Sequence, residues 1–216
     1  MTKQEFQTLT EKILLLDGAT GSNLMTLGMP RGVCTELWIM EHKELMIDLQ
    51  KAYIKAGSQL IYAPTFGANP LTLSDYGLED RLEEINHTLV SYSKEAADGK
   101  ALVAGDLTTT GKYITVDGPY TYEAAFQNYR AQISALSKAG VDCLIAETMI
   151  SIEESLAAVD AALSVCSLPI LCTMTVEADG SIFGGGNAVE AAIALESAGA
   201  SAVGINCSVG PDQLAS

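Results

Sequence analysis

Short apolar runs alternate with longer stretches of helical period along most of the chain. Each run holds three to five apolar residues and ends at a turn signal. Runs of this kind are typical of strands buried on both faces, as in parallel sheets. They predict six strands, near residues 13–16, 59–63, 101–105, 142–146, 169–174 and 202–206.

The segments between these runs carry the stripes of amphipathic helices. Apolar residues recur at steps of three and four from Tyr122 to Leu136 and again from Ile152 to Leu163. Ser151 and Glu154 predict a capping box at the start of the second of these helices. Three predicted helices end in Ala-Gly just before a strand, where glycine suits a left-handed C-cap. These glycines are Gly57, Gly140 and Gly199.

Parallel βα repetition leaves two architectures, a doubly wound sheet or a (β/α)₈ barrel. The segment from Asp17 to Gly21 contains glycines but not the GxGxxG spacing of a dinucleotide fold. Polar residues at nearly every strand exit fit the barrel, whose chemistry lies on that face. We therefore expect a TIM-barrel type α/β fold with about six βα units. No linker divides the chain, so residues 1–216 are expected to form one domain.

The residues at the strand exits are the candidates for chemistry, and they are Asp17, Thr65, Asn69, Asp106, Glu147 and Cys207. A carboxylate after an apolar run, like that of Glu147, is costly unless it is paired or used. Asp17 is either an acceptor for a substrate ammonium or a turn residue that caps its own loop. Cys207 is a nucleophile, a metal ligand or a small buried hydrophobe.

Composition narrows the partners. The 216 residues include 27 acidic and 12 basic side chains, which gives a formal net charge of −15. That field repels phosphate backbones and anionic lipid, so neither nucleic acid nor a membrane surface is an expected partner. No apolar run reaches the roughly 18 residues of a membrane helix. Five scattered cysteines without a CxxC argue against a disulfide framework, so we expect a soluble cytoplasmic protein.

The strand-exit motifs together resemble the homocysteine S-methyltransferase family. Within it, the chain is most similar to the homocysteine-binding module of cobalamin-dependent methionine synthase. The resemblance extends from about Leu14 to Pro211 and depends on five motifs in the same order at successive exits. They are Leu15–Gly21, Thr65–Ala68, Gly105–Asp106 with Thr110–Gly111, Glu147–Thr148 and Gly204–Pro211.

The resemblance implies a zinc ion held by three cysteine thiolates, with the homocysteine sulfur as fourth ligand. Cys207 matches the first of these thiolates. The other two form a Cys-Cys pair near the family's last strand, and this sequence has no Cys-Cys. The chain therefore resembles a barrel module that lacks its last two βα units, and we expect residues 1–216 alone to bind zinc weakly and to transfer no methyl group.

The same resemblance assigns the substrate contacts. Asp17 and Glu147 are expected to hold the ammonium group of homocysteine, and backbone amides near Gly18 and Ala19 its carboxylate. Thr65 and Asn206 complete the expected substrate site.

The implied methyl donor is methylcobalamin supplied by another module or chain, or a small sulfonium or betaine as in single-module relatives. Two alternatives stay open. One is a non-catalytic or partner-dependent barrel fragment, and the other is an unrelated barrel lyase or aldolase that uses Glu147 as acid or base. Open strand edges at residues 13–16 and 202–205 predict an oligomer or poor solubility.

Overall fold

A five-stranded parallel sheet forms the centre of the computed structural model, which describes residues 1–213. The strands are β1 (Leu60–Tyr62), β2 (Leu102–Thr108), β3 (Cys143–Met149), β4 (Ile170–Met174) and β5 (Ala202–Ile205). They lie in the order β1-β2-β3-β4-β5, so each strand pairs with its neighbours in sequence. A doubly wound sheet reverses its strand order at a switch point, whereas a barrel does not. The fold is therefore an α/β fold of the barrel type.

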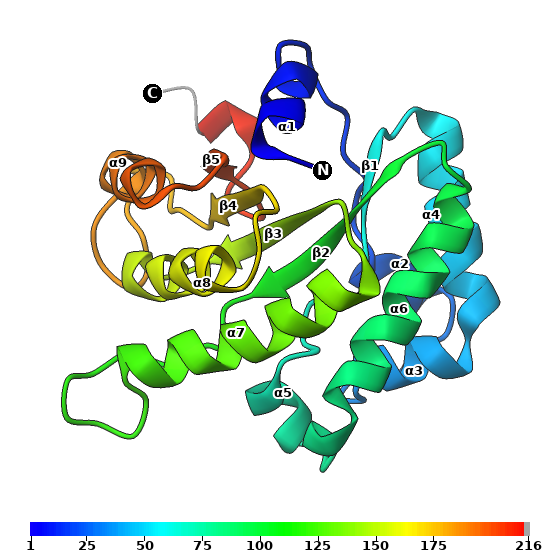
Figure 1. Ribbon diagram of the computed structural model, residues 1–216, viewed down its shortest axis with the longest axis horizontal. Helices are drawn as coiled ribbons and strands as arrows, with labels where there is room; N and C mark the ends of the chain where they lie inside the picture. The colour runs from blue at the N-terminus through cyan, green and yellow to red at the C-terminus, as the bar shows by residue number, and fades with distance from the viewer. Residues whose placement is uncertain (214–216) are drawn as a thin grey trace.

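The longer helices follow one another along one side of the sheet (Figure 1). They are α4 (Lys43–Ala56), α6 (Leu82–Ala97), α7 (Tyr122–Ala139), α8 (Ile152–Val165) and α9 (Ala188–Ala198). Shorter helices complete the described chain: α1 (Lys3–Thr10), α2 (Gly21–Thr26), α3 (Thr35–Glu41), α5 (Pro70–Ser74), η1 (Glu79–Arg81) and η2 (Pro211–Gln213). None of the helices in residues 1–213 combines the length and apolarity needed to cross a membrane.

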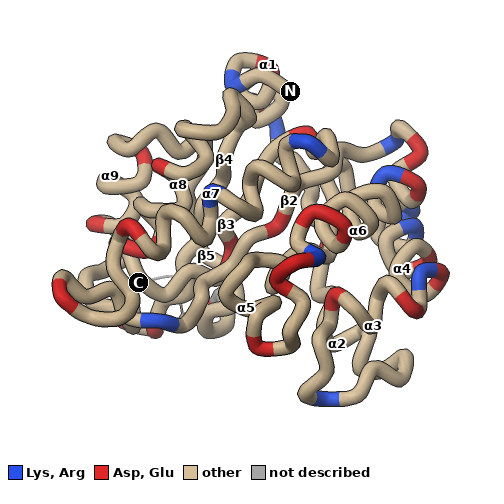
Figure 2. Tube along the Cα trace, turned by 60° about the horizontal axis from the view of Figure 1, so that its bottom comes forward, with Lys and Arg blue, Asp and Glu red and all other residues tan. Residues whose placement is uncertain are grey.

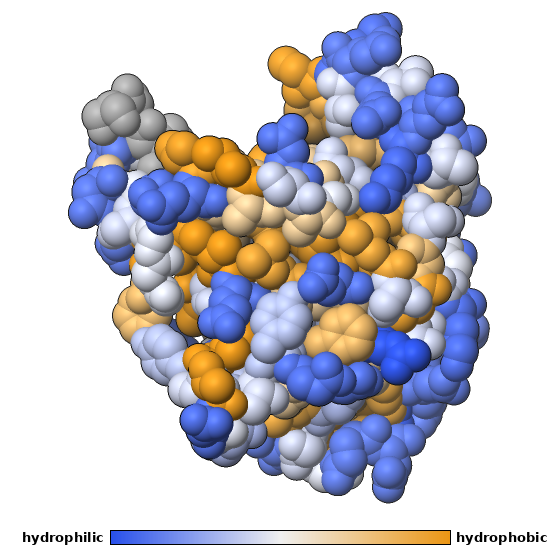
Figure 3. Space-filling view, turned by 60° about the vertical axis from the view of Figure 1, so that its left-hand side comes forward, coloured by the Kyte–Doolittle hydropathy of each residue, from blue (hydrophilic) through white to orange (hydrophobic). Residues whose placement is uncertain are grey.

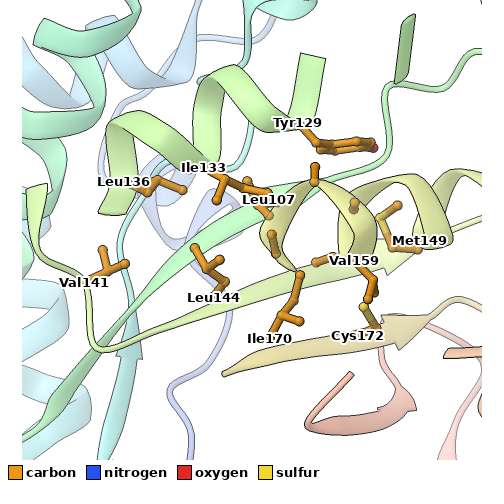
Figure 4. Close-up of a cluster of buried hydrophobic side chains, with 14 of the residues drawn as sticks. Leu107, Tyr129, Ile133, Leu136, Val141, Leu144, Met149, Val159, Ile170 and Cys172 are labelled. Carbon is orange, nitrogen blue, oxygen red and sulfur yellow. The ribbon is translucent and has the colours of Figure 1, made fainter. Parts of the chain in front are cut away.

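Strands β2 to β4 are mostly buried, as their continuous apolar runs predict, whereas most of β5 is exposed. Toward the helices, Leu144, Ile170 and Cys172 pack with the apolar stripes of α7 and α8 (Figure 4). Toward the inside of the curved sheet, Cys143 and Ile145 pack with Phe6 from α1. The first helix thus closes the amino-terminal end of the sheet's inner face.

The three predicted helix ends are confirmed. Gly57, Gly140 and Gly199 follow α4, α7 and α9 with φ of 119°, 81° and 102°, and each donates its N–H to carbonyls of the preceding turn. A residue with a β-carbon would be strained in this left-handed region.

The predicted first strand is wrong. Residues 13–16 form only a single parallel bridge, between Leu16 and Leu60. Ile13 and Leu15 are 87% and 52% exposed, and in the described part of the chain no second strand lies beside them. Their backbone hydrogen bonds to the start of β1 are limited to the Leu15 carbonyl, which accepts the N–H groups of Gln59 and Leu60, so no continuous ladder forms.

The predicted capping box on α8 is half right. The hydroxyl of Ser151 accepts the backbone N–H of Glu154 at 3.3 Å, as a cap should. The Glu154 carboxylate does not complete the box, because it is buried against Thr109, Thr110 and Tyr129 instead.

Candidate functional site

A cavity of about 810 Å³ opens at the carboxyl ends of the strands. Its wall combines the segment after Leu16, the exits of β1, β2, β3 and β5, and one face of α3. Four carboxyl side chains line it, and none of the described lining residues is Lys, Arg or His. Acidic positions on β2 and β3 lie in the middle of the molecule in Figure 2. The four are Asp17, Glu36, Asp106 and Glu147.

Asp17 enters the cavity just beyond the bridge between Leu16 and Leu60. Its Oδ2 accepts the backbone N–H of Tyr62, at the end of β1, at 2.9 Å. Burial raises the pKa of Asp17 to about 7, and the nearby charge of Glu147 adds to this, while the bond from Tyr62 opposes it. Asp17 therefore titrates near neutral pH.

Asp106 and Glu147 lie on the neighbouring strands β2 and β3. Asp106 is 5% exposed, and its Oδ1 has no hydrogen-bond partner among the described residues. Burial raises the pKa of Asp106 well above its ordinary value, and the charges of Glu147 and Asp17 raise it further. Burial also raises the pKa of Glu147, although a hydrogen bond with Asp106 opposes that rise. Such a cluster is stabilised by a cation that replaces its bound protons.

Asn206 follows β5 and reaches the exit of β3. Its Oδ1 accepts the backbone N–H of Thr148 at 3.0 Å, and its Nδ2 donates to Glu147 Oε2 at 3.1 Å and Thr148 Oγ1 at 2.9 Å. Cys207 comes next in the chain, and its exposed side chain lines the cavity. Asn206 and Cys207 therefore share one cavity with Asp17 and Glu147.

Gly18 and Ala19 also line the cavity. The Tyr53 hydroxyl, from α4, donates to the Ala19 carbonyl at 2.9 Å, and Asn23 Nδ2 donates to the same oxygen at 2.6 Å. A β-carbon on Gly18 would lie 2.9 Å from the Tyr53 ring. Close approach by this tyrosine therefore requires glycine, and it fixes the loop that carries Asp17.

Thr65 lies behind the cavity wall. Its side chain is fully buried, its hydroxyl donates to the Asp106 carbonyl at 2.9 Å and accepts the Asp106 N–H at 3.1 Å. The Gln132 amide, from α7, donates to the Thr65 carbonyl at 2.7 Å. Thr65 thereby joins the exits of β1 and β2 and supports the strand position of Asp106.

Sequence reasoning missed Glu36. This residue of α3 is 5% exposed, and its Oε1 accepts the backbone N–H of Gly67 at 2.7 Å in the loop after β1. Burial raises the pKa of Glu36. In the sequence it resembles an ordinary acidic residue in the first turn of a helix, so no local signal distinguishes it.

The described residues do not assemble a metal site. Residues 1–213 contain no group of three or more His, Cys, Asp or Glu side chains that could hold an ion. Cys207 is one candidate thiolate, whereas catalytic zinc sites use about three protein ligands. The donor set of this part of the chain does not fit zinc.

A parallel βα sheet with its cavity at the carboxyl ends is the arrangement of (β/α)-barrel enzymes. The family model described as "Homocysteine S-methyltransferase" matches residues 14–216. The chain belongs to the homocysteine S-methyltransferase family.

Curated relatives carry several names within this family. A methionine synthase of Mycobacterium leprae is 25% identical over 96% of the chain, which corresponds to 19% of that protein. Betaine–homocysteine S-methyltransferase 1 of Mus musculus is 32% identical over 80% of the chain, 42% of that protein. S-methylmethionine–homocysteine S-methyltransferase BHMT2 of Pongo abelii is 32% identical over 89% of the chain, 52% of that protein. The chain spans at most about half the length of these three relatives.

The fold has a solved counterpart. The metallated form of the homocysteine methyltransferase MmuM from Escherichia coli superposes with a TM-score of 0.80 at 22% identity, over 96% of this chain and 78% of that one. At this identity the likeness establishes the shared barrel-type fold alone.

Proposed function

We propose that this chain forms the homocysteine-binding part of a homocysteine S-methyltransferase, which methylates the homocysteine thiol to give methionine. The acidic cavity at the strand exits carries the proposal. A buried carboxyl oxygen of Asp106 has no partner there, and no basic side chain of the described residues lines the wall. A substrate ammonium would neutralise this cluster.

In this proposal the amino acid lies along the cavity wall. Its ammonium group contacts Asp17 and Glu147, and the backbone of Gly18 and Ala19 takes its carboxylate. Thr65 and Asn206 would complete the site by supporting its carboxylates, since Thr65 bonds the backbone of Asp106 and Asn206 bonds Glu147. The thiol points toward Cys207. The protein's contribution is to hold the nucleophile in one orientation, which converts an encounter in solution into a positioned attack.

The cofactors are part of the proposal as well. Zinc is the proposed metal, and a thiolate is the nucleophilic form that the reaction needs. We propose that zinc needs ligands besides Cys207, so that residues 1–216 alone transfer no methyl group. Methylcobalamin, supplied by another module or chain, is the proposed donor, and the match to a methionine synthase over 96% of the chain supports it.

We also propose a domain organisation, a compartment and an oligomeric state for the chain. Residues 1–216 would form one barrel-type domain that acts in the cytoplasm, where the five unpaired thiols would stay reduced. Open strand edges would bring it into an oligomer.

A non-catalytic or partner-dependent barrel fragment is the alternative, and the lack of a three-ligand metal group in residues 1–213 favours it. The two proposals differ in whether the cavity binds homocysteine.

An aldolase or lyase that forms a Schiff base is disfavoured, because no lysine of the described residues lines the cavity.

Calorimetric titration with L-homocysteine tests the proposal. Glu147→Gln should weaken binding by about tenfold to a hundredfold, because a hydrogen bond to a charged group is lost. Asp142→Asn is the matched control. Asp142 precedes the same strand at its opposite end and accepts the Val103 N–H at 2.8 Å. If titration of the unaltered chain with L-homocysteine produced no heat of binding, the result would support the barrel-fragment alternative instead.

A further inference from the structure

The side-chain amide of Asn206 is used entirely within the protein. Its oxygen accepts the Thr148 N–H, and its nitrogen donates to Glu147 Oε2 and Thr148 Oγ1. The same nitrogen lies 3.5 Å from the Cys207 sulfur. One amide therefore contacts two residues near the carboxyl end of β3, Glu147 and Thr148, and also Cys207, the next residue after Asn206 in the chain.

These contacts cross a strand. β4 lies between β3 and β5, so Asn206 spans the exit of β4 to reach Glu147 and Thr148. The ladder between β3 and β4 shifts register between Ala146 and Met149, the stretch that contains both residues. A bulge of this kind redirects a side chain, and here the bulged residue is a cavity carboxylate.

The backbone is in an unusual conformation at Thr148 and at Cys207, two of the residues that the Asn206 amide contacts. Thr148 and Cys207 have φ of 57° and 50°, in the left-handed region that residues with a β-carbon rarely adopt. Such conformations persist where surrounding contacts hold them, and they concentrate at functional sites. The Thr148 N–H is held by Asn206, and Asn206 is held in turn, because Thr175 and Ser208 hydroxyls donate to its carbonyl at 3.3 and 3.2 Å.

We propose that Asn206 is a positioning residue, which holds the bulged Glu147–Thr148 turn and the start of the Cys207 turn in the geometry that the substrate meets. It acts through Glu147 rather than by touching the amino acid, and this part of the inference rests on the proposed homocysteine site. The hydrogen bond from the Thr148 N–H to the Asn206 side chain does not depend on the proposed substrate site.

Hydrogen exchange at the Thr148 amide tests the hold directly. Asn206→Asp keeps an acceptor for the Thr148 N–H but has no donor for Glu147, whereas Asn206→Ala keeps neither. The Thr148 amide should stay protected in the Asp variant and exchange about tenfold faster or more in the Ala variant, in line with a local opening. Equal protection in the unaltered chain and the Ala variant would overturn the hold.

A double-mutant cycle on the L-homocysteine dissociation constant tests how Asn206 acts. Asn206→Ala should raise the constant about tenfold in the unaltered chain and less than twofold in a Glu147→Ala background, since residues that act through one another are not additive. Equal factors in both backgrounds would mean a direct contact with the substrate and would overturn the positioning role. Glu147→Gln provides a second background if the alanine variant does not fold.

Asn187→Ala is the matched control for both measurements. Asn187 caps α9 through the N–H groups of Val189 and Glu190 and does not line the cavity. Its loss should lower the melting temperature without changing the Thr148 exchange rate or the dissociation constant. If the unaltered chain binds no L-homocysteine, the proposed function fails, while the exchange measurement still decides whether Asn206 holds Thr148.

Discussion

The carboxylate of Glu154 accepts both the backbone N–H and the hydroxyl of Thr110, at 2.8 and 2.5 Å, although the two residues are 44 positions apart. The hydroxyls of Thr109 and Tyr129 donate to the same carboxylate at 2.5 and 2.9 Å. Glu154 is fully buried, so these donors replace the water it has lost. One side chain of α8 thereby ties the loop after β2 to α7 and α8.

Replacement of Glu154 should therefore lower the free energy of unfolding. Glu154→Ala removes the acceptor of four hydrogen bonds. The Tyr129 and Thr110 hydroxyls keep a second acceptor, whereas the Thr109 hydroxyl and the Thr110 N–H lose theirs, and we expect a loss of about 3 kcal/mol in the free energy of unfolding. Glu190→Ala removes a carboxylate from the exposed capping box of α9 and should cost about 0.5 kcal/mol. Urea denaturation of both variants makes the comparison, and equal losses would contradict the buried role of Glu154.

Stability should fall as the pH rises through neutrality. The pKa of Asp17 is about 7 in the folded chain against an ordinary value of 3.8, so the folded state binds more protons between these values. The contribution of Asp17 to the free energy of unfolding is then fully present below about pH 4 and is lost as the pH rises through the folded-state pKa of about 7. From pH 5.5 to 8, Asp17 alone accounts for a loss of about 2 kcal/mol.

Asp17→Asn should reduce this pH dependence in urea titrations, and the raised pKa values of Asp106 and Glu147 should account for what remains. Asp98→Asn is the control, because an exposed ion pair with Lys100 lowers the pKa of Asp98 and it does not titrate in this range. A flat profile for the unaltered chain would contradict the buried state of Asp17.

Patterns in the sequence predicted what local chemistry determines. Apolar runs located β1 to β5, and the glycines after α4, α7 and α9 were placed correctly because left-handed caps favour glycine. The strand-exit rule brought Asp17, Glu147 and Cys207 into one cavity.

Sequence patterns could not predict the features that depend on residues far away in the chain. Residues 13–16 have the composition of a strand, but they pair with β1 at a single bridge. Glu154 matches a capping box, yet donors 44 and 45 residues earlier outcompete the local one. Glu36 reaches the cavity only because the loop after β1 folds over α3.

Zinc retention should distinguish a complete site from an incomplete one. With Cys207 as the matched thiolate and no group of three ligands in residues 1–213, the chain should hold well under one zinc per molecule after dialysis against a mild chelator. Cys207→Ala should show the same low content. Stoichiometric zinc in the unaltered chain would reveal a different ligand set, and the assignment of Cys207 would then depend on whether its alanine variant loses the metal.

The edge of β5 should drive self-association. β5 pairs with β4 along one side, and no strand of the described chain pairs with the other. Val203 and Ile205 on β5 are 38% and 43% exposed, and Figure 3 shows hydrophobic surface gathered in a hollow on one face of the molecule.

Unpaired N–H and C=O groups beside apolar side chains form a template for a further strand, and lysine on such an edge blocks pairing. Sedimentation velocity should show association that increases with concentration in the unaltered chain and weakens in Val203→Lys. Val116→Lys is the control for added charge, because Val116 is 92% exposed in the loop after β2 and away from any strand. A stable monomer across the concentration range would contradict the open edge as an association surface, and equal weakening by both lysines would assign the association to net charge instead.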